Sequence, residues 1–246
     1  METVTSLSLL VRSTAYGETD RILTLFTRDQ GKISVLARGA AKSTKRFGGA
    51  LEPFSLIETT VRQVTKRIWP LQEARQVKVF IGLSKNLRRL ESASFLLELT
   101  REVLPEHQPE PALFDLVLAA LTELEQSAEE KIAKLAISAE LKIMAISGTA
   151  VAVDSCNACG RPVPSGKRVT FNPLRGGIVC RQCGGGPLVL SAGAQSALAN
   201  LARLPLDRIS EIELTSDQED ELTKALDQFL EQHLGYRFKT KLAHYF

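Results

Sequence analysis

Two Cys-x-x-Cys pairs constrain the fold of this chain more than any other feature of its sequence. Cys156 pairs with Cys159 and Cys180 with Cys183, and these are the only cysteines among 246 residues. Two thiolates at this spacing can bind one ion from a single tight turn, and two pairs complete the tetrahedral shell of a structural zinc site. A glycine follows each pair and lets the backbone curl around the metal with positive φ. The pattern predicts a structural Zn²⁺ in a closed site.

The same cysteines could instead form two disulfides, a redox dithiol or four unrelated buried thiols. A redox dithiol is typical of a βαβ unit, which the sequence lacks here. Disulfides need an oxidising compartment, and the N-terminal residues have no pattern of a secretory signal. No run of about 18 apolar residues suggests a membrane span. We therefore expect a cytoplasmic protein with reduced, metal-binding cysteines and no membrane partner.

Charge is distributed unevenly along the chain, although the net charge is only +3. Residues 1–80 contain 13 Lys and Arg against 7 Asp and Glu, and residues 151–190 contain 5 against 1. Segments 81–150 and 191–246 are acidic. Positive charge in two separate structural units favours a polyanionic partner. Ordinary solvated surface is the alternative interpretation.

The first 80 residues have the pattern of a small β-barrel. In the third expected strand Ile33, Val35 and Ala37 face one way, whereas Lys32 and Arg38 share the outward face. The other expected strands lie at 6–13, 21–27, 54–64 and 68–79. Five short strands with a longer break after the third favour an OB-fold, with a helical cap in part of that break.

From about Leu83 the apolar residues take helical spacing, with Leu83, Leu87, Leu90 and Leu97 on one face. Later helical segments are expected at 113–124 and 131–146, from near Ser191, and from Asp217 behind a capping box. Ser216 and Glu219 form that box. The expected fold is α+β and multidomain: an OB-fold β-barrel at 1–80, an α-helical domain at 81–151 and 189–246, and an inserted four-cysteine zinc module at 152–188.

Three groups of cations are candidate phosphate contacts. The first lies around the break after the third strand, where small residues allow the backbone to approach phosphates closely. The second lies at the turn between the fourth and fifth strands, a usual ligand loop of OB-folds. The third lies in the zinc module. The groups are Lys32, Arg38, Lys42, Lys45 and Arg46; Arg62, Lys66 and Arg67; and Arg161, Lys167, Arg168, Arg175 and Arg181, of which Arg168 and Arg175 are the strongest candidates.

Motifs of catalysis are missing. No segment satisfies the P-loop pattern, and no Gly-x-Ser-x-Gly elbow occurs. His107, His233 and His244 lie away from the cysteine pairs in sequence and are expected to be surface or structural residues. Acidic pairs on helices are expected to be solvated. We therefore expect no enzymatic activity.

Four segments resemble the bacterial RecO family, whose members mediate recombinational DNA repair. These segments, Tyr16–Leu23, Thr27–Ser34, Ala37–Ser43 and Phe47–Phe54, cover most of the first 60 residues. The likeness weakens through the helices and returns at the four cysteines, which only some members have. The likeness recurs in the tail Leu234–Thr240, but Phe238 and Thr240 replace the Leu and Ser of the family pattern, so no role is assigned to the tail.

The resemblance implies an OB-fold, a helical domain and a zinc module that binds Zn²⁺. It also implies binding of single- and double-stranded DNA and annealing of complementary strands in a nucleoid-associated protein. Implied partners are RecR, the single-stranded-DNA-binding protein and, indirectly, RecA. Two other hypotheses stay open from the residues alone. A protein-interaction scaffold would dock an acidic segment on the basic patch, and a zinc-ribbon transcription factor would prefer one duplex sequence.

Overall fold

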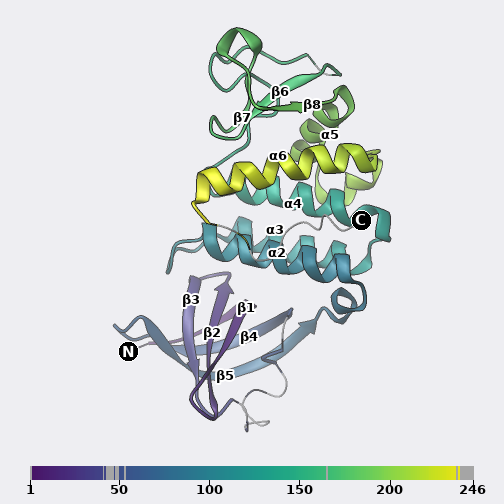
Figure 1. Ribbon diagram of the computed structural model, residues 1–246. Coiled ribbons are helices and arrows are strands. Elements are labelled where there is room, and N and C mark those ends of the chain that lie inside the picture. The colour runs from purple at the N-terminus through teal and green to yellow at the C-terminus, as the bar shows by residue number, and fades with distance from the viewer. Residues whose placement is uncertain are drawn as a thin grey trace.

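The computed structural model shows the chain as three stacked parts (Figure 1). A β-barrel at one end is followed by a layer of helices, and a small sheet covers the far side of the helices. The structure describes residues 2–40, 42, 47, 50–52, 54–164, 166–236 and 238. None of the helices in these ranges is long and apolar enough to cross a membrane.

Five strands close into a barrel in the order β1-β2-β3-β5-β4. Neighbouring strands are antiparallel except β3 and β5, which are parallel, and β1 closes the barrel against β4. This topology confirms the predicted OB-type barrel. The strands are β1 (Thr3–Tyr16), β2 (Asp20–Thr27), β3 (Gly31–Ala37), β4 (Ser55–Arg62) and β5 (Ile68–Val79).

The alternation expected in the third strand is confirmed. Ile33, Val35 and Ala37 are fully buried in the barrel core, and the residues between them are partly exposed. Phe47 is 2% exposed and belongs to this core. The expected helical cap falls on residues 41–49, of which the structure describes only two.

The helical layer packs around α4, which has buried residues on most of its circumference because α2, α3, α5 and α6 all contact it. Its members are α2 (Leu87–Val103), α3 (Pro111–Gln126), α4 (Ile132–Ile146), α5 (Ala192–Arg203) and α6 (Ser216–Leu234), with 3₁₀ turns η1 (Ile81–Lys85), η2 (Glu129–Lys131) and η4 (Leu206–Glu211). The predicted face of the first helix is wrong at Leu87, which is 63% exposed. This residue is the first of α2, and Leu83 belongs to the preceding turn.

The N-terminus of α6 differs by one residue from the prediction. The capping box consists of Thr215 and Gln218, whose side chains each bond the backbone N–H of the other residue. Ser216 and Glu219 fit the same sequence pattern but lie one position too late. Gly235 ends the helix with φ of 60°, a conformation that favours glycine.

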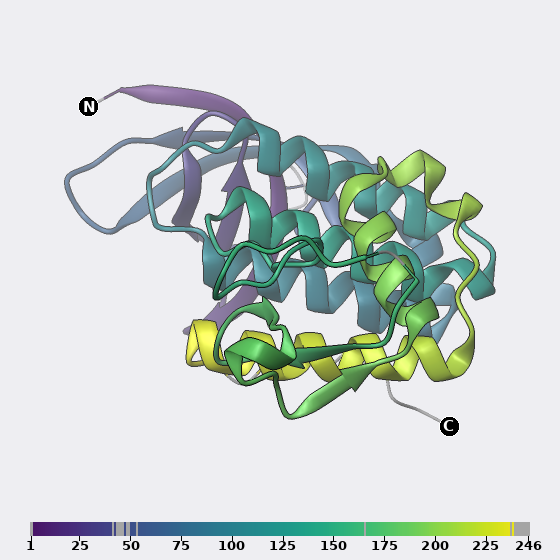
Figure 2. The ribbon, with the colours of Figure 1, turned by 90° about the horizontal axis from the view of Figure 1, so that it is seen from above.

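The segment from Val153 to Leu190, which we call the cysteine module, folds on the outer side of α5 and α6. Its sheet has the order β7-β6-β8 and packs on the helices through β8. Figure 2 shows the module from above, over the helical layer and alongside α6. The elements are β6 (Val169–Asn172), β7 (Gly177–Ile178), η3 (Arg181–Cys183) and β8 (Leu188–Leu190).

Candidate metal centre and nucleic-acid interface

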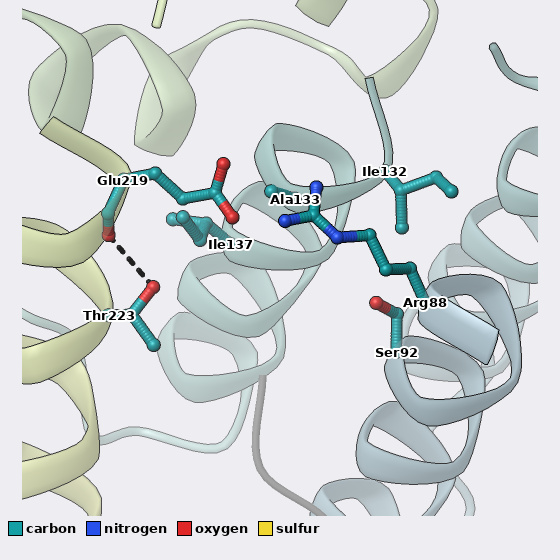
Figure 3. A pocket seen from close by; sticks show the side chains of 7 residues that line it. All are labelled: Arg88, Ser92, Ile132, Ala133, Ile137, Glu219 and Thr223. Atoms are coloured by element: carbon teal, nitrogen blue, oxygen red, sulfur yellow. Dashed lines mark hydrogen bonds between the residues drawn. The ribbon is translucent and has the colours of Figure 1, made fainter. Parts of the chain in front are cut away.

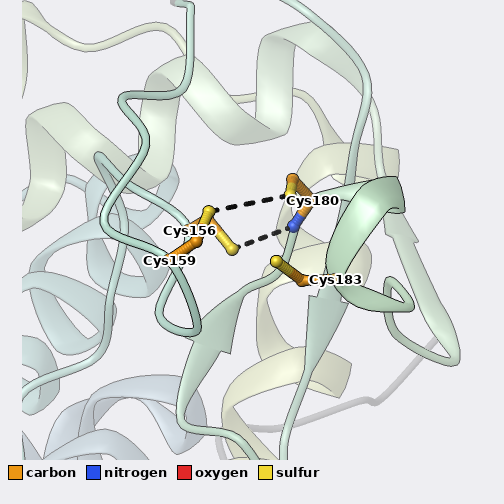
Figure 4. Close-up of side chains that lie close together, drawn as sticks. All are labelled: Cys156, Cys159, Cys180 and Cys183. Atoms are coloured by element: carbon orange, nitrogen blue, oxygen red, sulfur yellow. Dashed lines mark hydrogen bonds between the residues drawn. The ribbon is translucent and has the colours of Figure 1, made fainter.

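The four cysteines converge at one point of the cysteine module (Figure 4). Their sulfur atoms all lie within 4.8 Å of one another, and the Sγ atoms of Cys159 and Cys180 are 4.0 Å apart. Zn–S bonds of about 2.3 Å in tetrahedral geometry place neighbouring sulfurs about 3.8 Å apart. The arrangement therefore fits a four-sulfur metal site, and a disulfide is not formed.

Two tight turns present the sulfurs. Gly160 donates its N–H to Cys156 O at 2.8 Å, and Gly185 donates to Cys180 O at 3.1 Å. The glycines that follow the two pairs, Gly160 and Gly184, have φ of 70° and 94°. The predicted positive φ of these glycines is confirmed, and it is a backbone conformation that L side chains rarely adopt.

Hydrogen bonds within the cluster shift the pKa values of two of the thiols in opposite directions. The Cys180 N–H donates to Cys156 Sγ at 3.3 Å and lowers the pKa of the Cys156 thiol to about 6. Hydrogen bonding with Cys180 and Cys159 raises the pKa of Cys183 to about 12. Four thiolates at this separation repel one another, so full deprotonation at neutral pH needs a cation among them. The donor set is thus suited to a metal ion.

Four basic residues of the cysteine module line a hollow, and the fifth, Arg175, bonds to the backbone of a cysteine turn. Arg168 and three neighbours line a hollow of about 380 Å³ with an apolar floor; those neighbours are Arg161, Lys167 and Arg181. Arg175, in contrast, donates from Nη1 to the carbonyl oxygen of Cys183 at 2.9 Å. The Asn157 side chain donates in turn to Arg175 O. Arg175 thus braces the two cysteine turns against each other.

On the barrel, one arginine from each of two basic groups that are distant in sequence lines the same hollow. Arg38 follows β3 and Arg62 ends β4, and both line one hollow of about 610 Å³ on the outer face. The hollow is floored by Leu36 and Leu71 and also borders Glu73. It forms because β5 runs between β3 and β4 in the sheet. Sequence spacing alone places these two arginines in separate groups.

Two other cations that were predicted to contact phosphate bond to groups of the protein instead. Lys32 does not extend a patch with Arg38, because six residues of strand separate them by roughly 20 Å and Lys32 Nζ donates to Arg101 O at 2.6 Å. Arg67 forms a two-pronged ion pair with Glu106 at 3.0 and 3.1 Å. Lys42 and Lys66 are exposed. Lys45 and Arg46 lie outside the described residues.

The partners of Lys32 and Arg67 were missed by sequence reasoning. Arg101 and Glu106 belong to the end of α2 and the loop after it, 69 and 39 residues further along the chain. No local pattern links them to the barrel. The acidic character of the helical segment was the only available signal, and it does not select Glu106 among its neighbours.

A small hollow between α2, α4 and α6 has Arg88 and Glu219 extending toward it from opposite sides (Figure 3). Its volume is about 20 Å³, which accommodates no more than a water molecule. It has no room for a substrate, so it does not add a catalytic site to the helical layer.

Comparison with known proteins identifies the family. The N-terminal model of recombination protein O matches residues 1–80, and its C-terminal model matches residues 84–242. The chain belongs to the RecO family. It is similar over almost its whole length to proteins named DNA repair protein RecO, and the RecO family places it in recombinational DNA repair.

Three RecO relatives illustrate the range. The protein of Anaeromyxobacter dehalogenans strain 2CP-C is 37% identical over 245 residues, which cover 98% of this chain and 95% of the relative. That of Myxococcus xanthus is 33% identical and covers 95% and 93%. That of Bacillus pumilus is 28% identical and covers 97% and 92%. The RecO likeness therefore includes the barrel, the helices and the cysteine module.

Proposed function

We propose that this chain is a recombination mediator that binds single- and double-stranded DNA without sequence specificity and anneals complementary strands. With RecR, it helps to load RecA on DNA coated by the single-stranded-DNA-binding protein. The observation that carries the proposal is the hollow on the barrel where Arg38 and Arg62 meet. Family membership supports it.

The hollow suits a phosphate backbone better than base edges. Arginine side chains form paired hydrogen bonds with phosphate oxygens. Contacts of this kind neutralise charge but carry no sequence information, so binding is tight at low salt and independent of sequence. The exposed Lys42 and Lys66 extend the proposed path, and Lys45, Arg46 and Arg168 are further candidates. We assign Lys32 and Arg67 a structural role instead, because they bond Arg101 O and Glu106 and so hold the barrel to the end of α2 and the loop after it.

Annealing by this surface needs no chemical step. Two strands repel through their phosphates, and a protein that masks this charge while holding both strands raises the rate of encounter. We accordingly propose a protein that is not an enzyme, needs no ATP and associates with the nucleoid. The parts proposed for this task are an OB-fold DNA-binding domain at 1–80, a helical domain at 81–151 and 189–246, and a zinc module at 152–188.

We assign Zn²⁺ to the four cysteines as a structural ion. A closed shell of four sulfurs has no open position for substrate. The metal would hold the turn of Cys156 and Cys159, which precedes β6, to the turn of Cys180 and Cys183, which follows β7. Arg175 braces the second turn through its hydrogen bond to Cys183 O. The metal's proposed contribution to DNA binding is the placement of Arg168 and the other cations around the module's hollow.

The proposal is tested by fluorescence anisotropy with an unstructured oligonucleotide over a series of salt concentrations. An Arg38→Ala/Arg62→Ala variant should bind at least about tenfold more weakly at moderate salt, and its salt dependence should be shallower because fewer phosphates are contacted. Arg75→Ala is the matched control, since Arg75 lies on β5 of the same barrel and pairs with Glu58 at 3.2 Å. Full affinity in the double variant would refute the assignment. A Lys42/Lys45/Arg46 triple alanine variant tests the rest of the path.

A further inference from the structure

Another hollow lies at one end of the barrel, beside the proposed phosphate path. It has a volume of about 560 Å³ and is lined by three loops that are distant in sequence. Gln30 comes from the β2–β3 turn, Gln63 and Thr65 from the β4–β5 turn, and His107 and Pro109 from the loop between α2 and α3. Arg62, on the phosphate path, is the direct neighbour of Gln63. The two hollows therefore adjoin along one strand end.

Trp69 and His107 form an aromatic platform in this hollow. Trp69 is 8% exposed and closes the end of the barrel core. The imidazole of His107 stacks on it, with ring centroids 4.8 Å apart and planes 29° from parallel. His107 is exposed and lines the hollow, and we take the ring face turned away from Trp69 as the binding face. Such a face binds the flat surface of a base irrespective of its identity.

The platform is held in place by contacts on both sides of His107. Its backbone N–H donates to Lys32 O at 3.0 Å, and the preceding Glu106 is fixed by the ion pair with Arg67. Gly31 permits this approach, because a Cβ atom there would come within 2.0 Å of the backbone oxygen of Gln108. The loop is therefore docked against β3 before any ligand arrives, which limits the entropy that binding costs.

The polar lining matches the edge of a base. Gln63 Nε2 donates to Gln30 Oε1 at 2.9 Å. This bond leaves the amide N–H groups of Gln30 and the carbonyl oxygen of Gln63 to serve as donor and acceptor. A base edge presents both kinds of partner. One donor and one acceptor that can adjust their positions favour hydrogen bonding without strict sequence preference.

The charges that line the hollow favour a neutral base over a phosphate as its ligand. Among the described residues that line the hollow, Glu2 is the one carboxylate, and no Lys or Arg is present. A phosphate inside would be repelled, whereas a neutral base would not. Lys66 follows Thr65 and Arg62 precedes Gln63 in the sequence, but neither cation lines the hollow itself. This arrangement places the backbone on the rim and the base within.

We infer that this hollow binds one unpaired base of single-stranded DNA, stacked on His107 and hydrogen-bonded by Gln30 and Gln63. The inference rests on the proposed DNA binding and adds a ligand to it. It also gives single strands an advantage over duplex, because a base inside a duplex is stacked and paired and cannot enter.

The test compares a thymidine oligonucleotide with one of equal length and charge whose central sites lack bases. Trp69 is the only tryptophan of the chain and reports on its own hollow by fluorescence. We expect the wild type to bind the normal strand about 5- to 100-fold more tightly, the range that stacking of one base produces. Its tryptophan fluorescence should change with the normal strand alone.

Two variants show which residue causes the difference in affinity between the normal and the abasic strand. His107→Asn removes the ring but tolerates the φ of 60° at this position, and it should bind both strands with the affinity that the wild type has for the abasic one. Lys66→Ala should weaken both strands equally and keep their ratio. Equal wild-type affinities, or an undiminished ratio in His107→Asn, would overturn the base site and leave the proposed DNA binding standing. Failure to bind either strand would overturn both.

Discussion

The ammonium nitrogen of Lys32 donates to the backbone carbonyl oxygen of Arg101 across 2.6 Å and so joins β3 of the barrel to the last turn of α2. Burial lowers the pKa of Lys32, and the nearby Glu102 and Glu106 oppose that shift. The cost of burying this charge is offset by a hydrogen bond inside the protein. Lys32 thus acts at the contact between two layers of the fold.

Replacing Lys32 should therefore affect stability and not DNA affinity. Lys32→Met should lower the free energy of unfolding by about 1–3 kcal/mol, the usual contribution of a hydrogen bond from a charged group. Denaturant unfolding measures this loss, and anisotropy at several salt concentrations measures DNA binding. A loss of affinity with a shallower salt dependence, at unchanged stability, would show that Lys32 contacts phosphate.

Removing one metal ligand should destabilise the chain. Cys180→Ser should release the metal and lower Tm by roughly 5–10 °C, since each kcal/mol lost shifts Tm by about 2–4 °C at this length. Val189→Ser is the control, because Val189 is 51% exposed on the same module. Metal content by elemental analysis should fall from one ion per chain to none in the cysteine variant alone. An unchanged melting curve after complete metal loss would show that the site is not structural.

Arg175 and Arg168 should differ although both are exposed cations of the cysteine module. Arg175→Ala removes the hydrogen bond to Cys183 O and should speed the transfer of metal to a chelator, with about 1 kcal/mol lost in stability. Arg168→Ala should retain metal as the wild type does and weaken DNA binding. Identical rates of metal transfer in the two variants would exclude the bracing role of Arg175.

Glu140 should make stability depend on pH. Its carboxylate is 1% exposed, finds no hydrogen-bond partner among the described residues, and has a pKa raised well above the usual value by burial and by Asp227. The folded state then holds the proton more tightly than the unfolded state. The contribution of Glu140 to stability is greatest below the ordinary carboxyl pKa of about 4.3 and falls as pH rises toward the folded pKa, by up to about 1.4 kcal/mol per pH unit.

Glu140→Gln cannot ionise and removes this dependence. The free energy of unfolding of the variant, relative to the wild type, should be larger at pH 8 than at pH 5. Urea titrations at the two pH values measure the difference. An equal offset at both would mean that Glu140 is not protonated preferentially in the folded state.

Local patterns predicted the elements of this fold better than its contacts. The alternation Ile33, Val35, Ala37 identified the inner face of β3, because one strand face is set by neighbouring residues. The predicted start of α6 lies one residue too late. Thr215 and Ser216 both begin a matching capping-box pattern, and only the observed hydrogen bonds show that Thr215 is the cap. The four cysteines converge as their spacing required.

Contacts between layers had no local signal. Lys32 has the position of an outward cation in its strand, and only the packing of α2 against the barrel turns it into an internal donor. Trp69 and His107 stack although they are 38 positions apart in the sequence. Arg38 and Arg62 line one hollow because their strands, β3 and β4, lie on either side of β5. These relationships depend on topology, which residue patterns constrain only weakly.

Above all, we propose that the protein anneals DNA through the barrel face around Arg38 and Arg62. The most direct test is the rate at which complementary oligonucleotides, each coated with single-stranded-DNA-binding protein, anneal without ATP. The wild type and Arg75→Ala should anneal them rapidly, and Arg38→Ala/Arg62→Ala should be at least about tenfold slower. Absence of annealing by folded, metal-loaded wild type, or full activity in the double variant, would contradict the account.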